Sequence, residues 1–216
     1  MNLGMPCRVA AVVLMALQPA IAQAQVNCPI AADLETGISV LYDDRVEHFR
    51  PAIGHPLELY LVEENFDGYI GYYFYTYGLY LQEKGELRNR QPLDGTATLY
   101  TYGFDDDSLL IPPSANMDFD VSVVASSIEV GGDRSMTSST HLWQAGPKTT
   151  FTIGTCTYVG FMVTVDISRN FGEHDVRRHS FYYLADLGIG LYTGSTDNGE
   201  EEQLMLPVAI VRSADL

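Results

Sequence analysis

The chain has 216 residues, 46% of them hydrophobic, and carries 12 Lys and Arg against 28 Asp and Glu, a formal net charge of −16. That apolar content is ordinary for a globular protein and excludes disorder throughout. Because so acidic a surface repels phosphate backbones and anionic headgroups, we expect no nucleic-acid partner.

The first 24 residues have the features of a cleaved secretory signal peptide. Arg8 supplies positive charge, residues 10–17 form a short apolar run, and residues 20–24 contain small-x-small cleavage sites. The apolar run is too short to span a bilayer, and nothing later is long enough. We therefore expect a mature chain of residues 25–216 that forms one domain, has no membrane span and is periplasmic or secreted.

Two cysteines remain in this mature chain, Cys28 and Cys156. In an oxidising compartment a remaining pair is most simply a disulfide. Closing a loop of well over a hundred residues stabilises the fold by about 5 kcal/mol in the chain-entropy model. Lipid attachment at Cys28 is disfavoured because Asn27 stands before it, where such a site needs a small residue.

Strand patterns dominate the mature chain. Residues 38–44 and 46–51 predict a hairpin, and residues 57–64 alternate strictly between two faces. No segment combines helical periodicity with caps and freedom from glycine. Further strands are predicted over residues 97–104, 119–130, 149–168 (one bent strand or two), 179–194 (two strands around a turn) and 202–212, with Pro207 at an edge or bulge. We expect an all-β, single-domain protein whose mostly antiparallel sheet is highly curved, as in a half-barrel or barrel.

Residues 67–81 read DGYIGYYFYTYGLYL and hold six tyrosines. Gly71 and Gly78 each cost a helix about 1 kcal/mol relative to Ala, and tyrosine favours strands, so we expect one strand here. Both of its faces are then aromatic, which fits a sheet covered on one side by core and on the other by loops or a ligand. Packing is the commoner use of such rings. The ligand-facing candidates are Tyr69, Tyr73, Tyr75 and Tyr77.

Two stretches read as irregular. Residues 105–118 predict the longest loop, and residues 131–150 predict a second one with room for a short strand. The second stretch holds His141 and Trp143, the one tryptophan of the chain. Trp143 is interpreted first as a packed loop anchor, and alternatively as a platform for a ligand.

The segments FTIGTCTYVGFMVTVDIS and HSFYYLADLGIGLYTG, from residues 151–168 and 179–194, resemble a pattern in exported bacterial proteins with highly curved antiparallel sheets. Lipoprotein carriers of the Lol type and several periplasmic families have comparable half-barrels. The resemblance implies a periplasmic half-barrel with a lipid-like or lipoprotein-like ligand, and it transfers no catalytic residue. Ala185 stands where that pattern has proline. The matching positions are Gly154, Thr155, Tyr183, Asp186, Leu187 and Gly188.

No motif assigns a catalytic residue, a metal or a cofactor. His174 and His179 lie five residues apart, which on a strand points them to opposite faces and on a helix is not the spacing of a zinc pair. The acidic runs 105–107 and 197–202 lack the alternating ligands of a calcium loop and read as charged turns. Neither G-x-S-x-G nor H-E-x-x-H occurs.

Three functions remain, in this order. The first is non-enzymatic binding of an apolar or lipid-like ligand inside a curved sheet, with Trp143 and the four tyrosines as candidate contacts. The second is an envelope protein that acts through a protein partner. The third, motivated only by acids and aromatic residues, is a hydrolase acting on carbohydrate.

Overall fold

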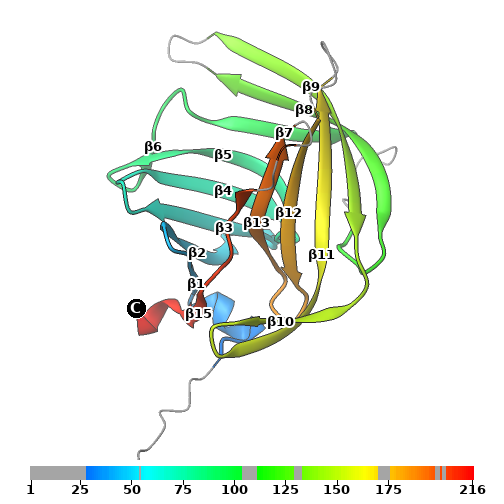
Figure 1. Ribbon diagram of the computed structural model, residues 1–216. Coiled ribbons are helices and arrows are strands. Elements are labelled where there is room, and N and C mark those ends of the chain that lie inside the picture. The colour runs from blue at the N-terminus through cyan, green and yellow to red at the C-terminus, as the bar shows by residue number, and fades with distance from the viewer. Residues whose placement is uncertain are drawn as a thin grey trace, which may run out of the picture.

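The computed structural model describes residues 28–53, 55–103, 111–128, 133–169, 176–197, 200 and 203–216. The all-β expectation is confirmed: the described residues form one antiparallel sheet of 15 strands that curves strongly and is not closed into a barrel (Figure 1). None of the helices in these ranges is long and apolar enough to cross a membrane. The predicted signal peptide lies outside the described residues.

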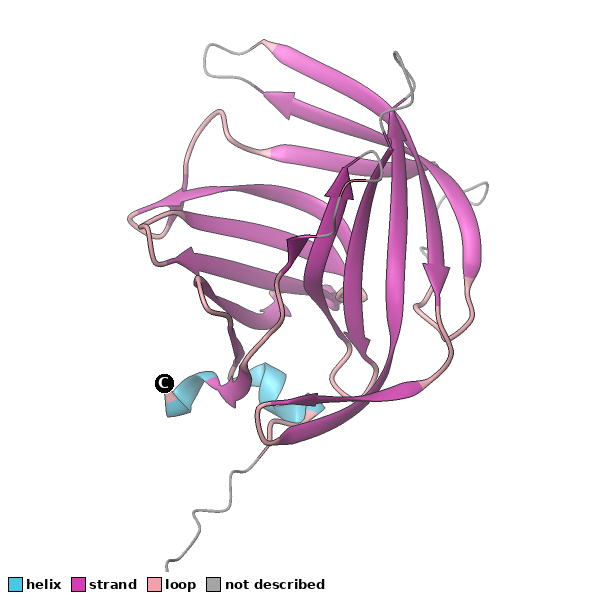
Figure 2. Ribbon diagram, in the orientation of Figure 1, coloured by secondary structure: helices cyan, strands magenta, loops and turns pink. Residues whose placement is uncertain are grey.

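Neighbours in the sheet are mostly neighbours in the chain, because short turns join antiparallel strands. Two short 3-10 helices, η1 and η2, flank the strands (Figure 2). In chain order the elements are η1 (Ala31–Glu35), β1 (Ile38–Leu41), β2 (Arg45–Ala52), β3 (His55–Asn65), β4 (Ile70–Thr76), β5 (Tyr80–Arg88), β6 (Gln91–Pro92), β7 (Thr98–Gly103), β8 (Asp118–Ile128), β9 (Arg134–Ala145), β10 (Thr149–Ile153), β11 (Cys156–Arg169), β12 (Val176–Leu184), β13 (Ile189–Asp197), β14 (Gln203–Leu204), β15 (Ala209–Arg212) and η2 (Ser213–Asp215).

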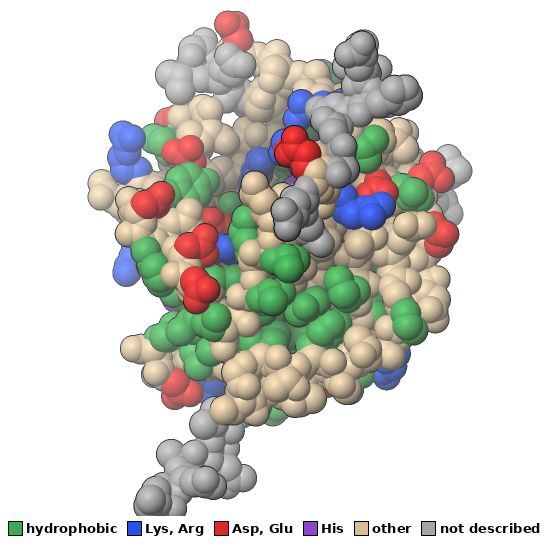
Figure 3. Space-filling model, in the orientation of Figure 1, with side chains coloured by type: hydrophobic (Ala, Val, Ile, Leu, Met, Phe, Trp, Pro, Cys, Tyr) green, Lys and Arg blue, Asp and Glu red, His purple; other side chains and the backbone are tan. Residues whose placement is uncertain are grey.

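The curvature brings the two ends of the sheet toward each other. In Figure 1 the strands β1 to β6 face β11 to β13 across the inside of the bend. The C-terminal segment touches both ends, since β14 pairs with β13 and β15 pairs with β1. The single strand predicted over residues 202–212 is wrong, because Pro207 lies between these two short strands in a segment without strand structure, where its missing N–H is tolerated. On the face drawn in Figure 3, hydrophobic side chains gather over this region, and Leu204, Leu206 and Val208 are exposed.

Two turns from opposite sides of the bend meet backbone to backbone. Gly78, in the turn between β4 and β5, accepts a hydrogen bond of 2.7 Å from the amide of Gly190 in β13. A Cβ built on Gly78 would lie 2.2 Å from the carbonyl oxygen of Gly188. Gly78 also has φ of +64°, so glycine is required here for space and for conformation.

Two apolar clusters lie on the concave side of the sheet. The first packs β1, β2 and β3 against β11 and β13, with Phe49 and Leu191 among its buried members. The predicted disulfide is confirmed at its edge, where Cys28 and Cys156 are joined across a sequence separation of 128 residues. The second cluster packs β5 against β8, β9 and β11 around Tyr80 and Val163. The disulfide therefore ties the start of the described chain to the middle of the sheet.

The tyrosine-rich segment was predicted as one strand, and this is wrong in one respect. The chain turns at Tyr77, which has φ of +52°, so the segment divides into β4 and the start of β5. Its two faces are both aromatic, as expected. On the convex side Tyr72 and Phe74 pack with Tyr60 of β3.

The loop predicted over residues 131–150 is also wrong, because most of it forms β9, a 12-residue strand. Its polar run of Ser and Thr concealed an alternation in which every second residue from Ser139 to Trp143 is buried. Residues 149–168 form two strands, with the turn at Gly154. Of the predicted loop 105–118, residues 111–117 contain no strand and the earlier part lies outside the described residues.

Candidate functional site

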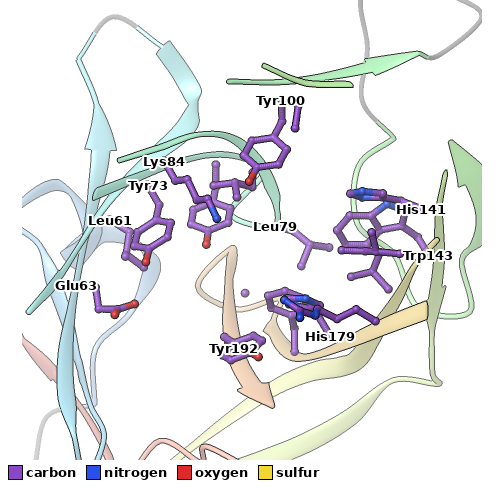
Figure 4. A pocket seen from close by; sticks show the side chains of 18 of the residues that line it. Leu61, Glu63, Tyr73, Leu79, Lys84, Tyr100, His141, Trp143, His179 and Tyr192 are labelled. Carbon is purple, nitrogen blue, oxygen red and sulfur yellow. The ribbon is translucent and has the colours of Figure 1, made fainter. Parts of the chain in front are cut away.

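The concave side of the sheet encloses a cavity of about 750 Å³ (Figure 4). Nearly every strand from β2 to β13 contributes to its wall, and Met205 of the C-terminal segment completes it. Such a volume lies within the range of roughly 300–1,000 Å³ that is usual for small-molecule sites. The residue types around it therefore decide what it can hold.

The wall changes character in the same direction along each strand. On β9 the inward residues run from buried Trp143 through His141 to exposed Thr137. On β11 they run from Val165 to Arg169, and pairing sets these two strands in register, with Trp143 opposite Val165.

The other half of the bend repeats this change. On the β5 side the inward residues run from buried Leu79, just before the strand, through Leu81 to exposed Lys84, and on β3 they run from Leu61 to Glu63. Figure 4 shows Leu79 near Trp143, with Lys84 and Tyr100 on the other side of the opening. The cavity thus has an apolar floor, a middle zone of tyrosine and histidine, and a charged mouth.

The floor and the middle zone contain polar atoms that find no partner among the described residues. Trp143 is 3% exposed, and its Nε1 makes no hydrogen bond with the described residues. Tyr80 packs against it, with 5.0 Å between the ring centroids, and the buried Tyr80 hydroxyl also makes no hydrogen bond with them. His141 is 6% exposed and its Nδ1 is also unpaired, while Nε2 lies 3.0 Å from the Ser139 hydroxyl. Each such atom costs stability that a well-satisfied core would not lose.

Both histidines of the wall are neutral near pH 7. Burial, with a smaller contribution from the nearby His179, lowers the pKa of His141 to about 4. Burial and the Arg177 guanidinium lower the pKa of His179 to about 4 as well. Neutral imidazoles accept and donate hydrogen bonds without bringing charge into the middle zone.

A buried arginine lies between two carboxylates on the β2–β3 side. Arg45 Nε donates to Glu47 Oε1 at 2.9 Å and lies 4.0 Å from Glu63 Oε2. The Arg45 guanidinium also covers the Tyr42 ring, at 3.8 Å from its centroid. Burial raises the pKa of Glu47 to about 7 although Arg45 opposes this, and burial raises the pKa of Glu63. One guanidinium here stands against the carboxylates of Asp44, Glu47 and Glu63, so acids outnumber bases on this side of the wall.

The five candidate ligand residues divide into two groups. Tyr73, Tyr75 and Trp143 line the cavity, and burial raises the pKa of both tyrosines, so their hydroxyls stay protonated. Tyr69 and Tyr77 are not part of the lining. Tyr69 precedes β4 with its ring over Gly71, and Tyr77 packs against the second apolar cluster from its turn. Trp143 lies in a strand, so its interpretation as a loop anchor is corrected.

Several lining residues were not found by sequence reasoning. Glu47 and Glu63 continue inward faces already set by Phe49 and Leu61, and strand alternation alone would have placed them inside. His141 was missed as a lining residue because its strand was read as a loop. Lys84 was not singled out in the sequence, and His179 was considered there only with His174 as a metal pair, because their place in the wall depends on the curvature that brings β5 and β12 face to face.

Catalytic chemistry has little support in this arrangement. Ser139 and His141 approach each other, but the Ser139 hydroxyl also lies 3.5 Å from the Val123 carbonyl oxygen, and the charge acting on His141 comes from another histidine. In the part of the chain that the structure describes, no three His, Cys, Asp or Glu side chains are grouped to hold a metal ion. His174 and Glu173 lie outside that part.

Comparison of the chain with protein-family models, with curated proteins and with solved structures found no match.

Proposed function

We propose that this protein binds one apolar or lipid-like ligand in the cavity of its curved sheet and performs no chemistry on it. The observation that carries the proposal is the cavity itself, about 750 Å³ on the concave side, where an ordinary sheet would bury side chains against one another. Its floor offers Leu79, Trp143 and Val165 to an apolar group. Burying apolar ligand surface there is favourable by roughly 25 cal/mol per Å² before the costs of association.

The single tryptophan gives the test its specificity, because Trp143 lies in the cavity wall. The probe is N-phenyl-1-naphthylamine, an uncharged dye that fluoresces in apolar surroundings and accepts excitation energy from tryptophan. We expect saturable dye fluorescence on excitation of Trp143. In Trp143→Phe the dye should still fluoresce when excited directly but show no energy transfer.

A matched pair of variants separates the cavity from the outer surface. Ala125 is a small lining residue of β8 that pairs with exposed Thr137, and Ala125→Phe adds a ring that narrows the cavity at this end of its wall. Ser122 lies on the same strand and is exposed on the opposite face, so Ser122→Phe adds the same ring outside. The proposal requires that Ala125→Phe weaken dye binding at least tenfold while Ser122→Phe leaves it unchanged. Equal binding by both variants, or no saturable binding by the parent protein, would refute it.

A further inference from the structure

The basic residues of this acidic protein concentrate in the cavity wall. Of the 11 Lys and Arg that the structure describes, four line the cavity, but only three of the 20 described Asp and Glu do. The four are Arg45, Lys84, Arg169 and Arg177, and the three are Asp44, Glu47 and Glu63. The wall therefore has the opposite charge balance to the chain as a whole.

The charges are also separated by position. The three acids and Arg45 belong to the β2–β3 side, where Arg45 pairs with Asp44 and Glu47. The other three bases stand on β5, β11 and β12, at the mouth. Arg177 is bound by Asp197 through two hydrogen bonds of 2.6 and 3.0 Å. Lys84 has no ion pair among the described residues, and its side chain extends into the cavity from β5 (Figure 4).

Lys84 faces a zone of neutral hydrogen-bonding groups. Figure 4 shows the Tyr73 and Tyr100 rings on its own side of the cavity, and His179 across from it. The positive charge of Lys84 makes a small contribution to lowering the pKa of His179. Phenol hydroxyls and neutral imidazole donate hydrogen bonds to an anion without repelling it. The Tyr73 hydroxyl already bonds to Glu63. An anionic group in this zone would therefore meet the Lys84 ammonium together with the donors of Tyr100 and His179.

Building on the proposed function, we propose that the ligand is a single-chain amphiphile with an anionic head group, bound with its chain on the floor by Trp143 and Leu79 and its head beside Lys84. The change from floor to mouth matches such a molecule along its length. The acidic outer surface does not oppose this, because charges separated by more than about 8–10 Å of salt solution are largely screened.

The test compares three probes that share a ten-carbon chain: decanoate, 1-decanol and decylamine. Binding is measured by titration calorimetry at pH 7.5 and by the change in Trp143 fluorescence. We expect decanoate to bind about tenfold more tightly than decanol, the size of one charge-assisted hydrogen bond. Decylamine should bind more weakly than both. The preference for decanoate should shrink as salt is raised.

Variants of Lys84 assign that preference to one residue. Because Lys84 is an exposed position, Lys84→Gln should fold normally, bind decanol as before and lose the preference for decanoate. Lys84→Arg should retain it. Lys148→Gln is the matched control, since it removes one positive charge from an exposed loop position outside the cavity lining and should change nothing.

The outcomes separate this inference from the proposed function. Decanol binding as tightly as decanoate, or decylamine binding most tightly, would overturn the anionic head group and leave the apolar cavity standing. A preference for decanoate that survives in Lys84→Gln would overturn the assignment to Lys84. Failure of all three probes to bind, together with failure of the uncharged dye, would count against the cavity as a ligand site altogether.

Discussion

The amide of Gly190 donates a hydrogen bond of 2.7 Å to the carbonyl oxygen of Gly78, and this contact holds the two sides of the bent sheet together at the cavity floor. The residues involved come from the β4–β5 turn and from β13, which lie far apart in the sheet order. The contact borders the cavity, because Gly190 and Leu79, the neighbour of Gly78, both line it.

Gly78→Ala should destabilise the protein strongly. The new Cβ would lie 2.2 Å from the Gly188 carbonyl oxygen and would also adopt φ of +64°. Overpacking and left-handed backbone together cost about 3 kcal/mol or more in the free energy of unfolding. Gly188→Ala is the control, because Gly188 has φ of +71° with nothing within 4 Å, and it should cost only about 1 kcal/mol. Urea unfolding of the two variants makes the comparison; equal losses would contradict the backbone contact.

The Cys28–Cys156 disulfide should stabilise the fold by up to about 5 kcal/mol, since it closes a loop of 128 residues. We expect the denatured, unreduced protein to show no free thiol from these two residues. The double variant Cys28→Ser, Cys156→Ser should unfold at much lower urea concentration. A variant as stable as the parent would show that the chain-entropy argument does not apply here.

The two histidines of the cavity wall should make the protein sensitive to acid. Their pKa values are about 4 in the folded state against an ordinary value of 6.5, so the unfolded state binds more protons between pH 6.5 and pH 4. Stability is then lost as pH falls through that window. His141→Gln combined with His179→Gln should flatten this loss. Melting temperatures between pH 4 and pH 7 test the prediction, and an unchanged pH profile in the double variant would contradict it.

Glu47 should act in the opposite direction. Its pKa rises from 4.5 to about 7 on folding, so the folded state binds more protons between these values and stability is lost as pH rises. The contribution amounts to at most about 3 kcal/mol across the window. Glu47→Gln retains the shape and removes the titration. Its stability relative to the parent should therefore increase from pH 4.5 to pH 7, and a constant difference would show that Glu47 titrates normally.

Much of the fold could be predicted because strand alternation is a local property. The buried leucines of β3 and the hairpin of β1 and β2 follow from period-two patterns and turn residues. The disulfide followed from cysteine count. The strand β9 was not predicted, because Ser and Thr occupy both of its faces in its first half. Buried residues alternate with less buried ones only from Ser139 to Trp143.

The site was less predictable, for a different reason. Tyr73, Tyr75 and Trp143 were proposed from residue type and do line the cavity, but residue type alone equally suggested Tyr69 and Tyr77. Which aromatic residue faces inward depends on where the chain turns, and the positive φ of Tyr77 moves it out of the strand. Lys84 faces His179 because the sheet is curved, and the sequence pattern of a single strand does not predict that curvature.

Native mass spectrometry, before and after denaturation, tests the central claim most directly when the protein is purified from cells that express the full chain. The account predicts an extra mass of one small amphiphile that disappears on denaturation and that is reduced in Ala125→Phe, whose added ring narrows the cavity. A bare mass in both proteins, with no uptake of the ten-carbon probes, would contradict it.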